Sequence, residues 1–399
     1  MKERRMRQLS EGFRHSLVND TVRFWTEHAV DREFGGFANY LDRTGSLLCP
    51  DKPMWFQGRF TWTFARLYNT LERREEWLSL ARHGIDFITR HGFDADGRVF
   101  FAVTRDGKPL RKRRYLFAEI FTILAYAEYA RAAHDEQSLA TAKRVLALVN
   151  DLAARPWNAP GALPPKVNPE TRPQRGHSMT MILINTLQVL RDCDFSPAPL
   201  AYDRLIDRQI DEVFRYFVKP ERRALLETVG PDGEYDGATP EGRCVNPGHA
   251  IETAWFILTE ARRRKDSALV ERTLPILDWS LERGWDEKHG GILYFVDVEG
   301  KQPVPYEWDM KLWWVHNEAI YATLLAHVMT GDPKYEKWFE RILSWSLARF
   351  PDRRYGEWFG YLHRDGSVSH SLKGNMWKGL FHLPRQQLNC HLLLAEGLT

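Results

Sequence analysis

The chain has 399 residues, of which 43% are hydrophobic and 27% charged, a composition typical of a folded globular protein with ample core. Its 56 basic and 53 acidic residues give a net charge of +3 without a long basic block, so we expect neither nucleic acid nor an anionic membrane as a partner. No stretch resembles a membrane span or a signal peptide, and the four scattered cysteines form no metal-type pair, which together favour a cytoplasmic protein with reduced thiols.

Amphipathic helices alternate with glycine-led strand-and-turn segments along the chain. Apolar periodicity predicts a helix over 9–29, a strand and turn over 34–45, and a second helix over 55–70. The same unit then recurs. Its further predicted helices cover 74–91, 115–133, 137–154, 177–191, 199–218, a segment from the turn at 246–248 to about 264, then 266–284, 314–329, 332–349 and 382–396.

The recurrence has a regular period. The glycine-led hairpins start near residues 36, 97, 224, 291 and 356, and the long gap after 97 spans two periods, with a degenerate connection at 156–175. This spacing indicates six helix–hairpin–helix units of roughly 65 residues, and no open-ended capping repeats flank them. The sequence therefore predicts an all-α (α/α)6 barrel, formed as a single catalytic domain over 1–399, with short β-hairpins gathered at one mouth.

The second helix of each unit is expected to lie inside the ring and to carry polar residues near its N-terminal end. In a closed ring these ends converge on one mouth, so their side chains are candidates for a shared site. The residues concerned are Gln57, Arg59, Glu119, His177, His249, Glu252, His316, Glu318, His382 and Arg385. Glu119 and Arg385 are candidate substrate-binding residues on this ground.

The segment 246–255 is the most informative of these helix starts. Asn246, Pro247 and Gly248 end one element, and His249 then lies in the first turn of an apolar helix. Glu252 follows three residues later on the same helix face, within reach of the imidazole. A histidine oriented by a carboxylate suits a general base that works near neutral pH.

Histidines that face each other across a cavity can remove a proton from one face of a carbon and return one to the other. An arginine can stabilise the enolate oxygen between these steps. The pattern thus favours epimerisation or aldose–ketose isomerisation beside a carbonyl, with no required cofactor and no metal. Metal binding by three histidines and glycoside hydrolysis remain as alternatives. Hydrolysis would draw its two carboxylates from Glu119, Glu227, Glu252, Glu307 and Glu318, although histidine dominates the helix ends.

At these residues the chain resembles the N-acylglucosamine 2-epimerase family. The resemblance spans roughly 24–394, and its most specific stretches are 55–59, 246–255, 307–319, 355–362 and 378–385. It implies an (α/α)6 barrel, usually dimeric, that interconverts sugars at C2 through a ring-opened enolate. It also implies that ATP activates the enzyme without being consumed.

The resemblance also implies roles for individual residues. His249 and His382 match the two proton-transfer histidines, Arg59 the enolate-side arginine, and Glu252 the carboxylate that partners His249. His316 matches a third pocket histidine that assists ring opening. The residues expected to line the sugar site are Lys311, Trp313, Trp314 and Trp377.

Other members of the superfamily keep alternative functions open. Mannose–fructose isomerases and cellobiose 2-epimerases share the enolate and differ in substrate or in the carbon that is reprotonated. The segment 377–385 resembles the N-acylglucosamine branch, whereas His177 is a departure from that branch that isomerases and disaccharide epimerases share. A non-catalytic binding protein is the alternative from a different class, and it would expose an apolar patch beside a blocked pocket.

Overall fold

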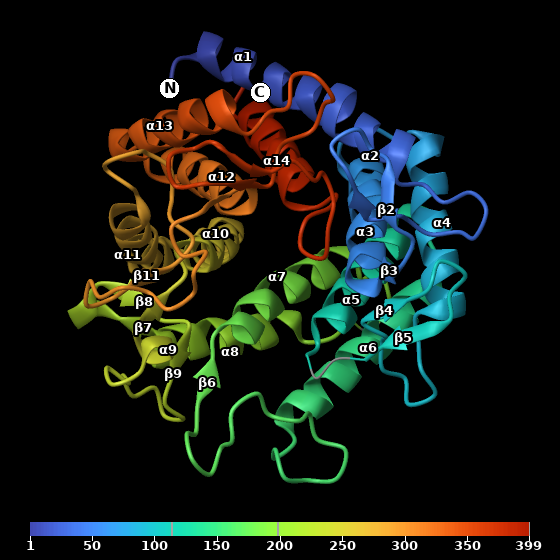
Figure 1. Cartoon of the computed structure of the whole chain (residues 1–399), viewed down its shortest axis with the longest axis horizontal. Helices are drawn as coiled ribbons and strands as arrows, with labels where there is room; N and C mark the ends of the chain where they lie inside the picture. The colour runs from blue at the N-terminus through green and yellow to red at the C-terminus, as the bar shows by residue number, and fades with distance from the viewer. Residues whose placement is uncertain (113–114, 198, 399) are drawn as a thin grey trace.

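Six inner helices form a closed ring. The structure is a computed structural model that describes residues 1–112, 115–197 and 199–398. Each inner helix contacts the inner helices before and after it, and the last contacts the first (Figure 1). The inner helices are α3 (Met54–Thr70), α5 (Phe117–Ala133), α7 (Ser178–Cys193), α10 (Pro247–Arg264), α12 (Trp313–Thr330) and α14 (His382–Glu396). This arrangement confirms the predicted (α/α)6 barrel.

An outer layer of helices covers the ring. Each inner helix packs against the outer helix that follows it, and α14 packs against α1, so that the N-terminal helix completes the outer layer (Figure 1). The inner helices α5 and α12 are buried on nearly all sides because they contact neighbours both within the ring and outside it. The outer elements are α1 (Glu3–Ser16) continued by η1 (Leu17–Val22) and α2 (Arg23–His28), α4 (Glu75–His91), α6 (Glu136–Ala154), α8 (Tyr202–Glu212) continued by η2 (Val213–Phe217), α11 (Ser267–Gly284) and α13 (Pro333–Arg349).

Short antiparallel strands join neighbouring units at one mouth. The strand that enters an inner helix pairs with the hairpin of the following unit in β3–β4, β6–β9, β10–β11 and β12–β13, and a bridge from Leu41 to Gly374 joins the last unit to the first. The strands are β1 (Tyr40–Leu41), β2 (Leu47–Cys49), β3 (Lys52–Pro53), β4 (Ala102–Val103), β5 (Pro109–Arg111), β6 (Arg175–Gly176), β7 (Val218–Lys219), β8 (Ala224–Leu225), β9 (Thr228–Val229), β10 (Cys244–Val245), β11 (Val296–Asp297), β12 (Lys311–Leu312), β13 (Tyr361–Leu362) and β14 (Val368–His370). The short helices η3 (Pro220–Arg222) and α9 (Pro240–Arg243) lie in the connections.

Three similar ion triads hold these junctions. In each triad a buried aspartate after an outer helix pairs with a lysine before an inner helix and with an arginine from the next unit's hairpin. Lys311 belongs to one of them, with its Nζ 3.1 Å from Asp286. Such pairs are retained where both charges are matched, since one partner alone would be a buried unpaired charge. The triads are Asp31–Lys52–Arg105, Asp286–Lys311–Arg364 and Asp352–Lys373–Arg43.

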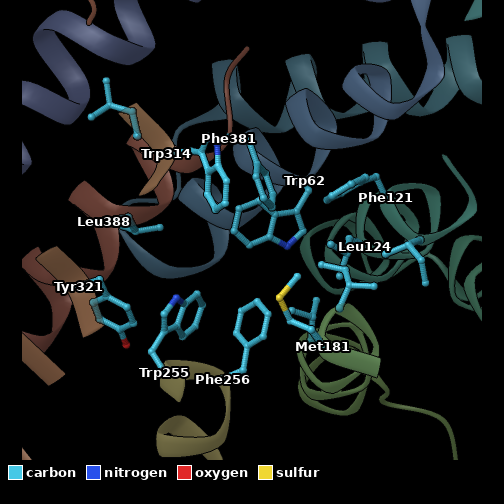
Figure 2. Close-up of a cluster of buried hydrophobic side chains, with 14 of the residues drawn as sticks. Trp62, Phe121, Leu124, Met181, Trp255, Phe256, Trp314, Tyr321, Phe381 and Leu388 are labelled. Carbon is cyan, nitrogen blue, oxygen red and sulfur yellow. The ribbon is translucent and has the colours of Figure 1, made fainter. Parts of the chain in front are cut away.

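The centre of the ring is filled with apolar side chains. Every inner helix, or the residue directly before it, contributes to this cluster, which is drawn in Figure 2. A packed interior leaves room for a site only at the mouth, where the hairpins gather. The labelled members are Trp62, Phe121, Leu124, Met181, Trp255, Phe256, Trp314, Tyr321, Phe381 and Leu388.

Candidate active site

One cavity of about 780 Å³ opens at the hairpin end of the ring. All six inner helices contribute side chains to it, as the converging helix ends predicted. The lining also includes residues from hairpins and loops. The inner-helix residues are Trp55, Arg59, Phe117, Phe121, Ser178, Met181, Ile182, His249, Glu252, Trp313, Trp314 and His382, and those from the connections include Lys166, Glu227, Tyr294, Tyr306, Glu307, Tyr361, Ser369, His370 and Trp377.

His249 lies in the first turn of α10, where the side chain of Asn246 caps the helix by accepting from the His249 main-chain N–H at 3.1 Å. The imidazole Nδ1 lies 3.0 Å from Oε2 of Glu227. Burial lowers the pKa of His249, but the charge and hydrogen bond of Glu227 outweigh burial, so the pKa stands above its ordinary value. The expectation that Glu252 orients His249 is therefore corrected, because Glu227 holds that position.

His382 is the first residue of α14, and its Nδ1 lies 2.7 Å from Oε1 of Glu318. Burial and the nearby charges of Arg59 and Arg385 lower the pKa of His382 well below its ordinary value. The environment of His382 thus favours the neutral ring, whereas that of His249 favours the protonated one.

The two histidines flank Trp314. The ring centroids of His249 and Trp314 are 5.3 Å apart, and those of Trp314 and His382 are 5.6 Å apart. Each histidine uses Nδ1 for a carboxylate, and within the described ranges neither Nε2 has a hydrogen-bond partner. Environments that push two pKa values apart are characteristic of an acid and a base that work as a pair.

Arg59 brings an unpaired cation to the cavity. Its side chain is buried, and the guanidinium lies 4.1 Å from the ring centroid of Phe121 and 4.4 Å from that of Phe381. It forms no hydrogen bond or ion pair with any residue that the structure describes, and Nε is buried without a partner. Burial and the charge of Arg385 lower the pKa of Arg59. A buried cation in this state stabilises negative charge that develops beside it.

Arg385 joins the carboxylates of Glu252 and Glu318. Its Nη2 donates to both, with a distance of 2.8 Å to Glu318, and it does not line the cavity. We therefore correct its expected role in binding substrate. Glu252, Glu318 and His382 also form a group whose ligand atoms lie within 4.8 Å of one another and could hold a metal ion. The guanidinium already supplies positive charge there, and the absence of a metal requirement stays a prediction.

The three predicted tryptophans all line the cavity. Trp313 and Trp314 are buried, whereas Trp377 is half exposed at the rim and packs edge-on against Trp55. Aromatic faces of this kind suit the C–H surfaces of a sugar ring. Tyr361 packs on Trp313 and extends the same wall.

Besides Arg385, four predicted site residues lie outside the cavity lining, and the structure corrects their expected roles. Lys311 belongs to its ion triad. Glu119 accepts from Arg98 Nε at 2.5 Å and from the Val99 amide at 3.2 Å, so it fixes the hairpin before α5. His177 is buried behind Glu227.

His316 is the fourth of these residues and has a structural role. Its Nε2 accepts from the Ile292 amide at 2.9 Å, its Nδ1 donates to the Leu312 carbonyl at 2.8 Å, and its ring stacks on Trp345 of α13. Burial lowers the pKa of His316 to about 3, so the neutral ring that these bonds require persists.

We expect His316→Leu to destabilise the fold and leave the chemistry intact. The substitution leaves a buried N–H and a buried carbonyl unpaired, which costs about 1–3 kcal/mol for each group. Denaturant unfolding should show this loss, while kcat per folded molecule should stay within roughly threefold of the wild type. A large fall in kcat with unchanged stability would return His316 to the active site.

Glu227 and Glu318 are the important partners that sequence reasoning did not assign to the histidines. Glu227 was identified only as a candidate carboxylate for hydrolysis, and Glu318 also as one of the polar residues at the inner-helix ends. Glu227 lies 22 residues before His249, and Glu318 lies 64 residues before His382, about one repeat away. The repeat length is the only signal in the sequence that relates Glu318 to His382, and no signal in the sequence relates Glu227 to His249.

Comparison with known proteins gives consistent matches over nearly the whole chain. The sequence model of the family described as N-acylglucosamine 2-epimerase (GlcNAc 2-epimerase) matches residues 35–384. The N-acylglucosamine 2-epimerase of Bos taurus is 36% identical over 388 residues, covering 96% of this chain and 90% of the relative. The cellobiose 2-epimerase of Dictyoglomus turgidum is 25% identical over 393 residues, covering 95% and 97%. The solved structure of cellobiose 2-epimerase from Bacillus thermoamylovorans has a TM-score of 0.84 at 21% identity, covering 97% of this chain and 99% of that chain, and it supports the fold.

Proposed function

Since the chain belongs to the N-acylglucosamine 2-epimerase family, we propose that it interconverts N-acyl-D-glucosamine and N-acyl-D-mannosamine by epimerisation at C2. The observation that carries this proposal is the pair of histidines beside Trp314. One ring has a raised pKa, the other a lowered pKa, and both have Nε2 unpaired among the described residues.

The proposed reaction uses the open-chain sugar. Neutral His382 removes the C2 proton, and the electron pair of the broken C–H bond moves into the C1 carbonyl to form an enolate. Arg59 stabilises the enolate oxygen. Protonated His249 then gives its proton to the opposite face of C2, so that the stereocentre inverts and no net proton is consumed. The reverse direction exchanges the roles of the two histidines.

The cavity wall made by α5 and α7 favours an N-acyl substrate. Phe117 and Phe121 of α5 and Met181 and Ile182 of α7 give this wall an apolar surface (Figure 2 shows Phe121 and Met181). When C1 lies at Arg59 and C2 lies between the histidines, the methyl group of the N-acyl substituent can pack against this apolar wall. The higher identity to the Bos taurus N-acylglucosamine 2-epimerase than to the Dictyoglomus turgidum cellobiose 2-epimerase agrees with this choice.

Mannose–fructose isomerisation is less well supported. The residue that favoured it was His177, which does not line the cavity. Proton NMR with N-acetylmannosamine, mannose and cellobiose as parallel substrates separates the candidates. We expect N-acetylglucosamine to form from N-acetylmannosamine. Fructose from mannose, or epimerised cellobiose, with the N-acetyl sugar unchanged would contradict the proposal.

The two pKa shifts predict a wide pH optimum. For the direction that begins at His382, activity requires His382 neutral and His249 protonated. Activity is then lost as pH falls through the pKa of His382, which is lowered below 6.5. It is also lost as pH rises through the pKa of His249, which is raised above 6.5. Measured kcat/KM should therefore show a plateau across neutral pH, bounded by the apparent pKa values of the pair. A narrow maximum with both limbs close to pH 6.5 would contradict the assignment.

We further propose that the enzyme is a cytoplasmic homodimer. The four cysteines are free, which agrees with a reducing compartment. Separately, none of the described helices is both long and apolar enough to cross a membrane. Light scattering after size exclusion tests the dimer. Activation by ATP, with no cofactor consumed, stays a prediction that turnover with and without the nucleotide tests.

A further inference from the structure

We propose that His177 is a positioning residue that holds the carboxylate of Glu227 in place behind His249. This inference rests on the proposed function, in which His249 transfers a proton at C2. His177 lies directly before α7, is fully buried, and does not line the cavity. It therefore acts through Glu227 and does not touch the sugar.

The backbone places the two residues against each other. The His177 amide donates to the Glu227 carbonyl at 3.0 Å, and strands β6 and β9 pair Gly176 with Thr228 beside this bond. Glu227 in turn reaches His249 with Oε2 at 3.0 Å. One carboxylate thus has a histidine at each of its two oxygens.

Two buried polar atoms face each other on the far side of this carboxylate. Nδ1 of His177 and Oε1 of Glu227 lie 3.6 Å apart, and neither has another hydrogen-bond partner among the described residues. A lone pair on Nδ1 would repel the carboxylate oxygen, so the contact requires a proton on Nδ1. A separation of 3.6 Å is longer than a hydrogen bond, and catalytic contacts of this kind often close only when substrate binds.

Thr253 fixes the other nitrogen of His177. Its Oγ1 lies 3.0 Å from Nε2 of His177 and 2.8 Å from the main-chain oxygen of His249. The hydroxyl donates its one proton to that main-chain oxygen, so Oγ1 accepts from an Nε2–H of His177. With a proton on each ring nitrogen, His177 is the cationic partner of the Glu227 carboxylate. His177, Glu227, His249 and Thr253 therefore form a closed cycle of contacts around the proposed acid.

The consequence is a rigid direction for Nε2 of His249. Without His177, the Glu227 carboxylate has a partner at only one oxygen and can rotate, and the imidazole that it holds moves with it. A misplacement of about 1 Å at a reacting group can lower the rate by on the order of 10²-fold. Substrate affinity should change little, because His177 does not contact the cavity.

Two substitutions separate positioning from bulk packing. The amide nitrogen of Asn lies near the position of Nδ1, whereas that of Gln lies near Nε2. His177→Asn therefore keeps a donor toward Glu227, and His177→Gln keeps only the bond to Thr253. We expect His177→Gln to lower kcat for N-acetylmannosamine by about 10- to 100-fold at nearly constant KM, and His177→Asn to recover most of that loss. Equal kcat in both variants, or a rise in KM without a change in kcat, would overturn the proposal.

A coupled variant and a control complete the test. In a Glu227→Gln background, His177→Gln should cause no further loss of kcat, because its effect passes through the carboxylate. Full additivity would overturn the proposal. His316→Gln, at another buried histidine outside the cavity, should lower stability without the kcat loss of His177→Gln. In the wild type, nitrogen NMR should show protons on both Nδ1 and Nε2 of His177, and a bare Nδ1 would contradict the assignment even if the variants did not fold. Wild-type turnover of N-acetylmannosamine tests the proposed function separately.

Discussion

We expect His382→Asn and His249→Asn each to reduce epimerisation by on the order of 10³-fold or more, because each removes the group that transfers a proton on one face of C2. The two variants should differ in what they retain. In His249→Asn, His382 still removes a proton from the epimer whose C2–H faces it and can return one only to the same face. That epimer then exchanges its C2 proton with solvent without inverting.

Proton NMR in heavy water measures this directly. Each variant should label a different one of the two epimers at C2, while the wild type labels both. Circular dichroism and thermal unfolding serve as controls for folding of each variant. If both variants exchanged the same epimer, or if either interconverted the epimers at nearly the wild-type rate, the two-histidine assignment would be wrong.

We expect Arg59→Met to remove turnover and to stabilise the protein. The guanidinium of Arg59 is buried and forms no ion pair with the described residues. The charges of Glu252 and Glu318 offset only part of the desolvation that lowers its pKa. Methionine fills similar space among Trp55, Phe121 and Phe381 without that cost. Loss of the cation beside the enolate oxygen should lower kcat by about 10²–10³-fold.

Thermal or denaturant unfolding and steady-state kinetics test the two halves of this expectation together. Arg243 provides a matched control, since it is also buried but pairs with Asp297 at 2.8 Å outside the cavity. Arg243→Met should lose stability, because it leaves Asp297 unpaired, and keep its kcat. A destabilised Arg59→Met variant with near wild-type kcat would show that Arg59 has a packing role and not a catalytic one.

The fold was predictable because the period of the sequence is long and regular. Hairpins recur about every 65 residues, and the predicted helices agree with the structure to within about three residues at most ends, with the first helix beginning earlier, at Glu3. The strands were predicted less well. Of the strand predicted within 34–45, only β1 forms. Gly35 and Gly36 have left-handed backbone conformations that turn the chain, and pairing partners come from neighbouring units.

The site was predictable only to the level of helix ends. His249, His316 and His382 all lie within the first turn of an inner helix, yet His316 points outward to Trp345 while the other two line the cavity. Which face of a helix turns inward depends on the packing of its neighbours, and a single sequence does not give that rotation. The carboxylate pairings were inaccessible for the same reason, since they join different elements of the ring.

The most direct test of the two-base mechanism is the deuterium content of the first product formed by the wild-type enzyme in heavy water. Our account predicts that N-acetylglucosamine formed at low conversion from N-acetylmannosamine carries deuterium at C2, because the proton removed by one histidine is not the proton delivered by the other. The remaining substrate should then be largely unlabelled. Product that keeps the substrate's own C2 proton would contradict transfer by two histidines on opposite faces.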